Sequence, residues 1–117
     1  MSTILIVDDD PSTRFVLRLI LEREGYKVLE AGNGAAALDM IRPDPLPDIV
    51  MTDLMMPVMT GVELVRRLRS DPRTAKVPIV VVSSNPDAAQ SLEVNAIVTK
   101  PFTAAKLADR IRSIAAA

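Results

Sequence analysis

Short runs of apolar residues alternate along the chain with segments in which apolar residues recur at helical spacing. Three runs are continuously apolar, which is typical of central parallel strands covered on both faces. Two others are shorter or more polar, as expected of edge strands. In chain order, the predicted strands are Ile4–Val7, Tyr26–Glu30, Ile49–Met51, Ile79–Val82 and Ala96–Val98.

The helical segments begin and end with suitable residues. Asp10 and Pro11 fit the start of a first helix, and Gly25 fits the position just after its end. Its residues expected to face the core are Val16, Leu19 and Ile20. Further helices are predicted over Gly34–Ile41, over Val62–Arg69 with Val65 and Leu68 inward, and over Ala104–Ile114 with Leu107, Ile111 and Ile114 inward.

One more helix, the fourth in chain order, is predicted to be short. Asn85, Pro86 and Asp87 form a good cap and start. Only about two turns, over residues 88–92, follow before the last strand.

This alternation of strands and helices is typical of an α/β protein with a parallel sheet. We expect a doubly wound, flavodoxin-like five-stranded sheet in the order 2-1-3-4-5, which places the two more polar or shorter strands at the edges. The 117 residues suffice for one hydrophobic core but not for two, so residues 1–117 are expected to form one domain.

Composition restricts the chemistry. The absence of cysteine excludes disulfides and thiol chemistry, and the absence of histidine excludes an imidazole base or ligand on this chain. Any metal must therefore bind to oxygen atoms. The net charge of −1 gives no general attraction to nucleic acid. A locally basic stretch is expected to be a solvated helix end. It contains Arg66, Arg67, Arg69, Arg73 and Lys76.

No apolar run is long enough for a membrane-spanning helix, and no signal peptide is visible at the N-terminus. We therefore expect a cytoplasmic protein without direct contact to a membrane.

Polar residues follow the predicted strands at the edge of the sheet where the strands end. They are Asp8 and Asp9 after the first strand, Asp53 after the third, Ser83 and Ser84 after the fourth, and Lys100 after the fifth. In the order 2-1-3-4-5, the chain reverses direction between strands 1 and 3 and leaves a crevice in which ligands bind. We therefore expect Asp8, Asp9 and Asp53 to share one site.

Carboxylates this close repel one another, by about 4 kcal/mol per pair at roughly 4 Å and an effective dielectric constant of about 20. Oxygen ligands favour Mg²⁺, with Mn²⁺ as an alternative, and Lys100 supplies a second positive charge. A carboxylate between two cations can act as a nucleophile toward a phosphoryl group, and this predicts that role for Asp53. The hydroxyl group of Ser83 is a candidate donor to the transferred group.

Each of these motifs has a simpler interpretation when it is taken singly. Acidic residues and serines after a strand are commonly turns or helix caps, and a single lysine is usually solvated. Capping does not require Lys100, however. The convergence of acids, hydroxyl and amine on one edge favours a functional site.

Four segments together resemble the receiver domain of bacterial response regulators. They are Ile4–Asp10, Asp48–Pro57 with Gly61 following, Val81–Ser84 and Thr99–Phe102. The resemblance extends over essentially the whole chain. Residues 70–76 also resemble an extended loop found in receivers that act without an attached output domain.

The resemblance implies specific roles in a two-component system. Asp53 would accept a phosphoryl group from a sensor histidine kinase or a phosphotransfer protein, and Ser83 and Lys100 would hold that group. The implied direct metal ligands are Asp9, Asp53 and the backbone carbonyl of Met55, and Asp8 would bind the metal directly or through its water shell. The bond between Lys100 and Pro101 resembles one that is cis in this family. By the same resemblance, Asn85 and Met55 would flank the path of the water that hydrolyses the acyl phosphate.

Three features depart from the family pattern. Ile97 replaces the aromatic residue that turns inward on phosphorylation in the family. Ser84 stands where Ala or Gly is usual, which predicts narrower access to the acyl phosphate. The interval from Ser83 to Lys100 is about one helical turn shorter than usual. This shortening changes a face on which relatives dimerise or contact their output domain or partner.

Three functions remain open from the sequence. The first is a phosphorylation-controlled module that changes its binding to a downstream protein or to a second copy of itself. The second is a metal-dependent phosphatase, which is disfavoured because Met55 replaces the acid or base expected two residues after the nucleophile. The third is an adaptor that binds partners regardless of phosphorylation, an alternative suggested by Ile97 and the short fourth helix.

Overall fold

A parallel sheet of five strands forms the centre of the computed structural model, which describes residues 2–41 and 45–115. The ends of the predicted domain, residues 1 and 116–117, and the segment 42–44 lie outside the described residues. The strands are β1 (Thr3–Val7), β2 (Lys27–Ala31), β3 (Ile49–Thr52), β4 (Ile79–Ser83) and β5 (Ala96–Thr99). Their order, β2-β1-β3-β4-β5, confirms the predicted doubly wound sheet.

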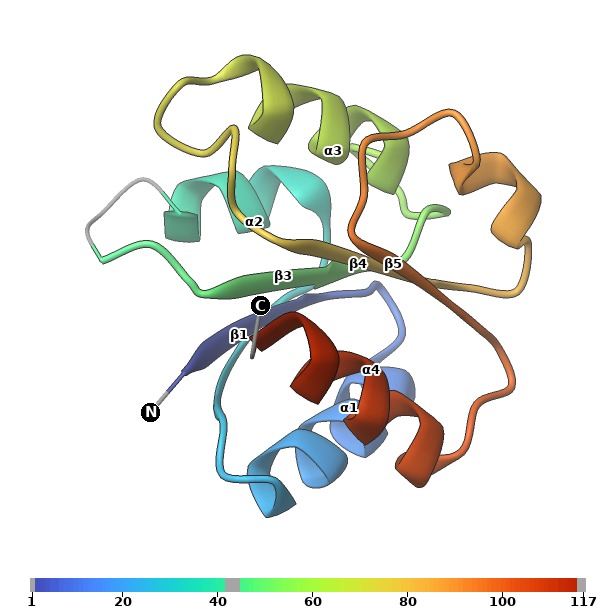
Figure 1. The fold of residues 1–117 in the computed structure, drawn as a ribbon. Helices are drawn as coiled ribbons and strands as arrows, with labels where there is room; N and C mark the ends of the chain where they lie inside the picture. Colours follow the sequence, from blue (N-terminus) through green and yellow to red (C-terminus); the bar gives the residue numbers. More distant parts are fainter. Residues whose placement is uncertain (1, 42–44, 116–117) are drawn as a thin grey trace.

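Helices cover both faces of the sheet (Figure 1). On one face lie α1 (Pro11–Arg23) and α4 (Ala104–Ala115), and on the other lie α2 (Gly34–Ile41) and α3 (Gly61–Ser70). Alternate residues of β1 point to opposite faces, so that Ile4 and Ile6 belong to the core under α1 and α4 while Leu5 and Val7 belong to the core under α2 and α3. The central strands are therefore apolar on both sides.

The ends of α1 agree with the prediction. Asp10 is the N-cap residue, and its side chain accepts a hydrogen bond of 3.0 Å from the amide of Ser12. Gly25, just beyond the end of the helix, has a φ of 93°, a value that glycine adopts without strain.

The prediction for the buried face of α1 is wrong at two positions. Leu17 and Leu21 are buried, whereas Val16 and Leu19 are 46% and 50% exposed. Ile20 is partly buried and packs on the core as expected. Six of the seven residues from 15 to 21 are apolar, so helical periodicity alone does not distinguish between neighbouring faces.

The other predicted inner faces are confirmed. Val65 and Leu68 of α3 are buried, as are Leu107 and Ile111 of α4, and Ile114 is partly buried against the same core.

The fourth predicted helix is only a 3₁₀ turn, η1 (Pro86–Ala89). It is short, as expected, and does not continue over residues 90–92. Asn85 lies at its N-cap position, but its side chain makes no capping hydrogen bond, so this part of the prediction is wrong. Ala89 anchors the turn because its side chain is buried against Leu54 and Val81.

Most of the basic stretch is exposed, as predicted, and Arg69 is the exception. Arg66, Arg67, Arg73 and Lys76 are exposed. The guanidinium group of Arg69 instead binds loop residues around β4, and burial lowers its pKa. Its acceptors are the carbonyls of Ala75, Val77 and Glu93 and the side-chain oxygen of Asn95, at 2.6 to 3.1 Å. Arg73 donates to the carbonyl of Ile41 at 3.0 Å. These arginines tie loops together.

None of the helices within residues 2–41 and 45–115 is both long and apolar enough to cross a membrane.

Candidate functional site

The sheet register brings the ends of β1 and β3 together. Val7 is paired with Thr52, so Asp8 and Asp53 directly follow paired residues. The amide of Asp53 donates to the carbonyl of Val7 at 3.0 Å. The two carboxylates therefore start from adjacent points of the sheet edge.

The structure confirms that Asp8, Asp9 and Asp53 lie together. Each offers a carboxylate oxygen, and these oxygens lie within 4.8 Å of one another. Asp8 is buried, Asp53 is intermediate and Asp9 is exposed, so the cluster opens to solvent on the side of Asp9.

Lys100 faces two of these carboxylates. Its ammonium nitrogen lies 3.2 Å from Oδ2 of Asp8 and 3.2 Å from Oδ2 of Asp53. The amide of Lys100 donates to the carbonyl of Ser83 at 2.9 Å, which places the residue at the end of β4. The bond from Lys100 to Pro101 is cis, as the resemblance implied. A fixed positive charge thus faces Asp53.

Burial and charge act in opposite directions at this site. Burial raises the pKa of Asp8, although the amide of Asp10 and the ammonium group of Lys100 lower it. Burial lowers the pKa of Lys100, but Asp8 and Asp53 together outweigh this effect and raise the pKa above its ordinary value. Lys100 is therefore fully protonated at neutral pH.

The arrangement fits a hard divalent cation. Three carboxylates and one ammonium group leave the cluster with two negative charges when all four groups are ionised. Carboxylate oxygens are the ligands that Mg²⁺ and Mn²⁺ prefer, and an exposed position at Asp9 leaves room for water on the ion. Met55 lies in the loop after Asp53 with an exposed side chain, and the role of its carbonyl stays a prediction.

Residues next to Asp53, which the sequence indicated only as part of the segment Asp48–Pro57, hold it in place. The amide of Leu54 donates to Oδ1 of Asp53 at 2.7 Å, and the hydroxyl group of Thr52 donates to the carbonyl of Asp53 at 2.7 Å. Gly61 fits closely against this segment because a Cβ atom there would lie 1.9 Å from the carbonyl oxygen of Asp53. Only adjacency to Asp53 in the sequence pointed to Thr52 and Leu54.

Ser83 lies at the same edge, beside Lys100. It is buried, and its hydroxyl oxygen accepts a hydrogen bond of 3.1 Å from the amide of Asn85. Ser84 and Asn85 are both exposed. Their effect on the lifetime of an acyl phosphate stays a prediction.

Ile97 lies on β5 and is far in sequence from the clustered carboxylates. Its side chain is partly buried and packs against a small cluster of Leu54, Val81 and Ala89. Leu54 is the neighbour of Asp53 and binds its carboxylate through the main chain. Ile97 and Asp53 are therefore connected through Leu54.

Arg14 of α1 also contacts the site, and nothing in the sequence indicated this contact. Its guanidinium group donates to the carbonyl of Asp8 and pairs with Glu30 of β2 at 3.1 Å. The side chain is 19% exposed.

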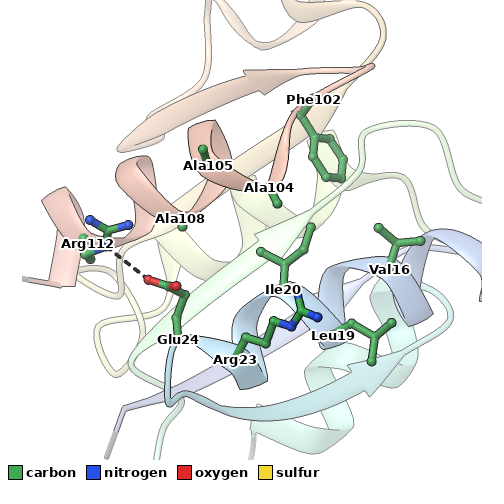
Figure 2. A pocket seen from close by; sticks show the side chains of 10 residues that line it. All are labelled: Val16, Leu19, Ile20, Arg23, Glu24, Phe102, Ala104, Ala105, Ala108 and Arg112. Carbon is green, nitrogen blue, oxygen red and sulfur yellow. Dashed lines mark hydrogen bonds and ion pairs between the residues drawn. The ribbon is translucent and has the colours of Figure 1, made fainter.

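A separate apolar groove runs between α1 and α4 (Figure 2). It has a volume of about 630 Å³, and Val16, Leu19, Ile20 and Phe102 supply much of its apolar lining. The ion pair between Glu24 and Arg112, with a distance of 3.2 Å, lies on its edge. None of the clustered carboxylates lines this groove, so the groove is separate from the acidic site.

Known proteins resemble this chain in sequence and in structure. The family model of the response regulator receiver domain matches residues 4–112. The phosphate regulon transcriptional regulatory protein PhoB of Pseudomonas aeruginosa is 38% identical over 117 residues, which cover 96% of this chain and 51% of that protein.

Two solved structures are similar over nearly the whole chain. A crystal structure described as a putative response regulator from Chloroflexus aurantiacus has a TM-score of 0.93 and 34% identity, covering 99% of this chain and 98% of the other. The response regulator protein TrrA of Thermotoga maritima, in complex with Mg²⁺ and BeF, has a TM-score of 0.87 and 27% identity, covering 97% of this chain and 99% of the other.

The chain spans about half the length of the first curated relatives that it matches. The shared part is the one that carries the carboxylate cluster, since the family model begins at Ile4 and extends beyond Lys100. By sequence, fold and site geometry, this chain belongs to the response regulator receiver domains of two-component signalling.

Proposed function

We propose that this chain is a phosphorylation-dependent switch in which Asp53 accepts a phosphoryl group. The observation that carries the proposal is that Asp53 lies both in the carboxylate cluster and 3.2 Å from the ammonium nitrogen of Lys100. Receiver domains bind Mg²⁺ in their active site. Here Asp8, Asp9, Asp53 and the carbonyl of Met55 would hold the ion, with Mn²⁺ as an alternative.

In the transfer step, a carboxylate oxygen of Asp53 forms a bond to the phosphorus of the donor. The bond from phosphorus to the donor nitrogen or oxygen breaks, and the leaving group keeps the electron pair. The product is an acyl phosphate on Asp53. The bound divalent ion supplies neutralisation of the charge on the phosphoryl oxygens, and Lys100 provides the same from the protein. The Ser83 hydroxyl would donate to a phosphoryl oxygen.

The donor is proposed to be a sensor histidine kinase, a phosphotransfer protein or a small acyl phosphate. The chain itself would then only accept the phosphoryl group and hydrolyse it slowly, without acting on other substrates. Ser84 and Asn85, which are exposed next to Ser83, would modulate this hydrolysis.

The output is proposed to be a change in protein contacts, in the cytoplasm and without direct binding to nucleic acid. The partner would be a downstream protein or, after phosphorylation, a second copy of the chain. Ile97 would respond to the state of Asp53 through Leu54, because Ile97 packs against the cluster that contains Leu54, the residue next to Asp53.

The test is to treat the protein with acetyl phosphate and Mg²⁺ and to measure the mass of the intact chain. We expect the gain of one phosphoryl group, and no gain in the Asp53→Asn variant. Labelling that persists in Asp53→Asn, or none in the unaltered protein, would contradict the proposal.

An adaptor that ignores phosphorylation is the second candidate, because Ile97 is not aromatic and η1 is only a short 3₁₀ turn. Affinity for a partner, measured with and without beryllofluoride, separates the two functions. A switch requires different affinities in its two states, whereas an adaptor would show the same affinity in both.

A further inference from the structure

The side chain of Arg14 contacts the acidic site at a main-chain carbonyl group and not at a carboxylate of the cluster. Its Nη1 donates to the carbonyl oxygen of Asp8, and its Nε lies 3.1 Å from Oε1 of Glu30. Arg18, one turn further along α1, binds the other carboxylate oxygen of Glu30. Glu30 is therefore held by two arginines, and only one of them reaches the site.

The carbonyl group that Arg14 holds belongs to the peptide unit joining Asp8 to Asp9. Because a peptide unit is planar, the direction of this carbonyl also determines where the amide and Cα of Asp9 lie. The amide of Asp8, on its other side, donates to the carbonyl of Ala31 at 3.2 Å. The main chain of Asp8 is thus held at both of its polar groups.

The three carboxylates are held to different degrees. Asp8 accepts from the amide of Asp10 at 2.9 Å and from Lys100, and Asp53 accepts from the amide of Leu54 and from Lys100. Asp9 is exposed, and its side chain has no hydrogen bond or ion pair among the described residues. Its position in the cluster depends on the main chain on which it stands.

We propose that Arg14 is a positioning residue for the metal site: by holding the carbonyl of Asp8, it directs Asp9 toward the ion, and Glu30 orients Arg14 for this contact. The inference rests on the proposed function, because it assumes that the clustered carboxylates bind Mg²⁺. It concerns a residue that touches neither the ion nor the phosphoryl group.

Electrostatics alone predicts the opposite effect of removing Arg14. A guanidinium group near a cation site repels the cation, so its loss would strengthen Mg²⁺ binding. If Arg14 positions Asp9, its loss weakens binding instead. The sign of the change in affinity therefore separates the two explanations.

The experiment compares Arg14→Met with Arg18→Met as a matched control. Each variant loses one positive charge and one ion pair with Glu30, but only Arg14→Met loses a contact to Asp8. Mg²⁺ alone is titrated into each protein and followed by amide chemical shifts in NMR. We expect Arg14→Met to bind Mg²⁺ about tenfold more weakly, as is typical when a residue that orients a metal ligand is lost. The Mg²⁺ affinity of Arg18→Met should change by less than about twofold.

Arg14→Lys provides a second test if Arg14→Met does not fold. It keeps the charge, but one ammonium group does not reproduce the planar fork that joins Glu30 to the carbonyl of Asp8, so binding should again weaken. Urea unfolding without metal measures the stability of each variant separately. A merely structural Arg14 would lower stability and leave the Mg²⁺ affinity of the folded protein unchanged.

The outcomes distinguish this inference from the proposed function. If the folded Arg14 variants bind Mg²⁺ as tightly as the unaltered protein or more tightly, the role of Arg14 is wrong, but the metal site is not affected by that result. No response of the unaltered protein to Mg²⁺ would contradict the metal site itself and the inference with it.

Discussion

The ammonium nitrogen of Lys100 lies 3.2 Å from a carboxylate oxygen of Asp53, although the two residues are 47 positions apart in the sequence. β5 ends just before Lys100 and β3 ends just before Asp53, with β4 between them in the sheet. The long side chain of Lys100 spans this distance along the sheet edge and reaches Asp8 as well.

This contact predicts the effect of Lys100→Met on phosphorylation. The variant lacks the cation that faces the developing charge on the phosphoryl oxygens, so the rate of acyl phosphate formation should fall about 100-fold. The rate is measured with acetyl phosphate by intact mass. Lys106→Met, at an exposed position of α4, is the control and should keep the original rate. Equal rates in both variants would refute the role of Lys100.

The raised pKa of Asp8 predicts how stability depends on pH in the absence of metal. Burial raises this pKa above 3.8, so the folded protein holds the proton more tightly than the unfolded chain does. Between the ordinary and the raised pKa, the free energy of unfolding due to this group falls as pH rises. Ionised Asp8 therefore destabilises the metal-free protein at neutral pH.

Asp8→Asn should consequently stabilise the metal-free protein by about 1 kcal/mol at neutral pH, since a buried charge is removed. The gain should disappear below the ordinary pKa of 3.8. Urea unfolding in the presence of a chelator measures both values. Asp10→Asn is a control of opposite sign, because hydrogen bonds from Thr13 and Ser12 lower the pKa of Asp10. A stabilising effect of the same size in both variants would count against this account of Asp8.

The close fit at Gly61 predicts a specific cost for a methyl group. In Gly61→Ala the new Cβ would meet the carbonyl oxygen of Asp53 at 1.9 Å and the Cα of Leu54 at 2.8 Å, both of them backbone atoms. We expect a loss of about 3 kcal/mol in thermal or urea unfolding. Gly32→Ala is the control, because its nearest contact is a side-chain atom at 3.7 Å. Similar stability of the two variants would show that the loop after Asp53 yields easily.

The buried face of α1 gives a stability test of the fold. Leu17→Ala removes a side chain that is 1% exposed and should cost about 3 kcal/mol. Leu19→Ala changes a residue that is 50% exposed and should cost less than about 0.5 kcal/mol. Urea unfolding measures both. A larger cost at Leu19 would mean that α1 is rotated relative to the orientation described above.

The fold was largely predictable from the sequence because its signals are local. Gly34–Ile41 was predicted with the observed bounds, and the apolar runs of the central strands were found to within a residue or two. The polarity of the two edge strands was consistent with the order 2-1-3-4-5 of a doubly wound sheet, and the acidic cluster followed from that order. Carboxyl ends of neighbouring parallel strands share one edge, so residues directly after them come together without further information.

Tertiary contacts decided the rest. The sequence determined that α1 is a helix and where it begins. Six apolar residues within about two turns did not specify its buried face, which the packing of the helix against the sheet decides. The bonds of Arg14 to Asp8 and of Arg69 to the loops around β4 were equally invisible. Long cationic side chains make contacts far from their own backbone, and only the folded chain determines which carbonyl groups lie within reach.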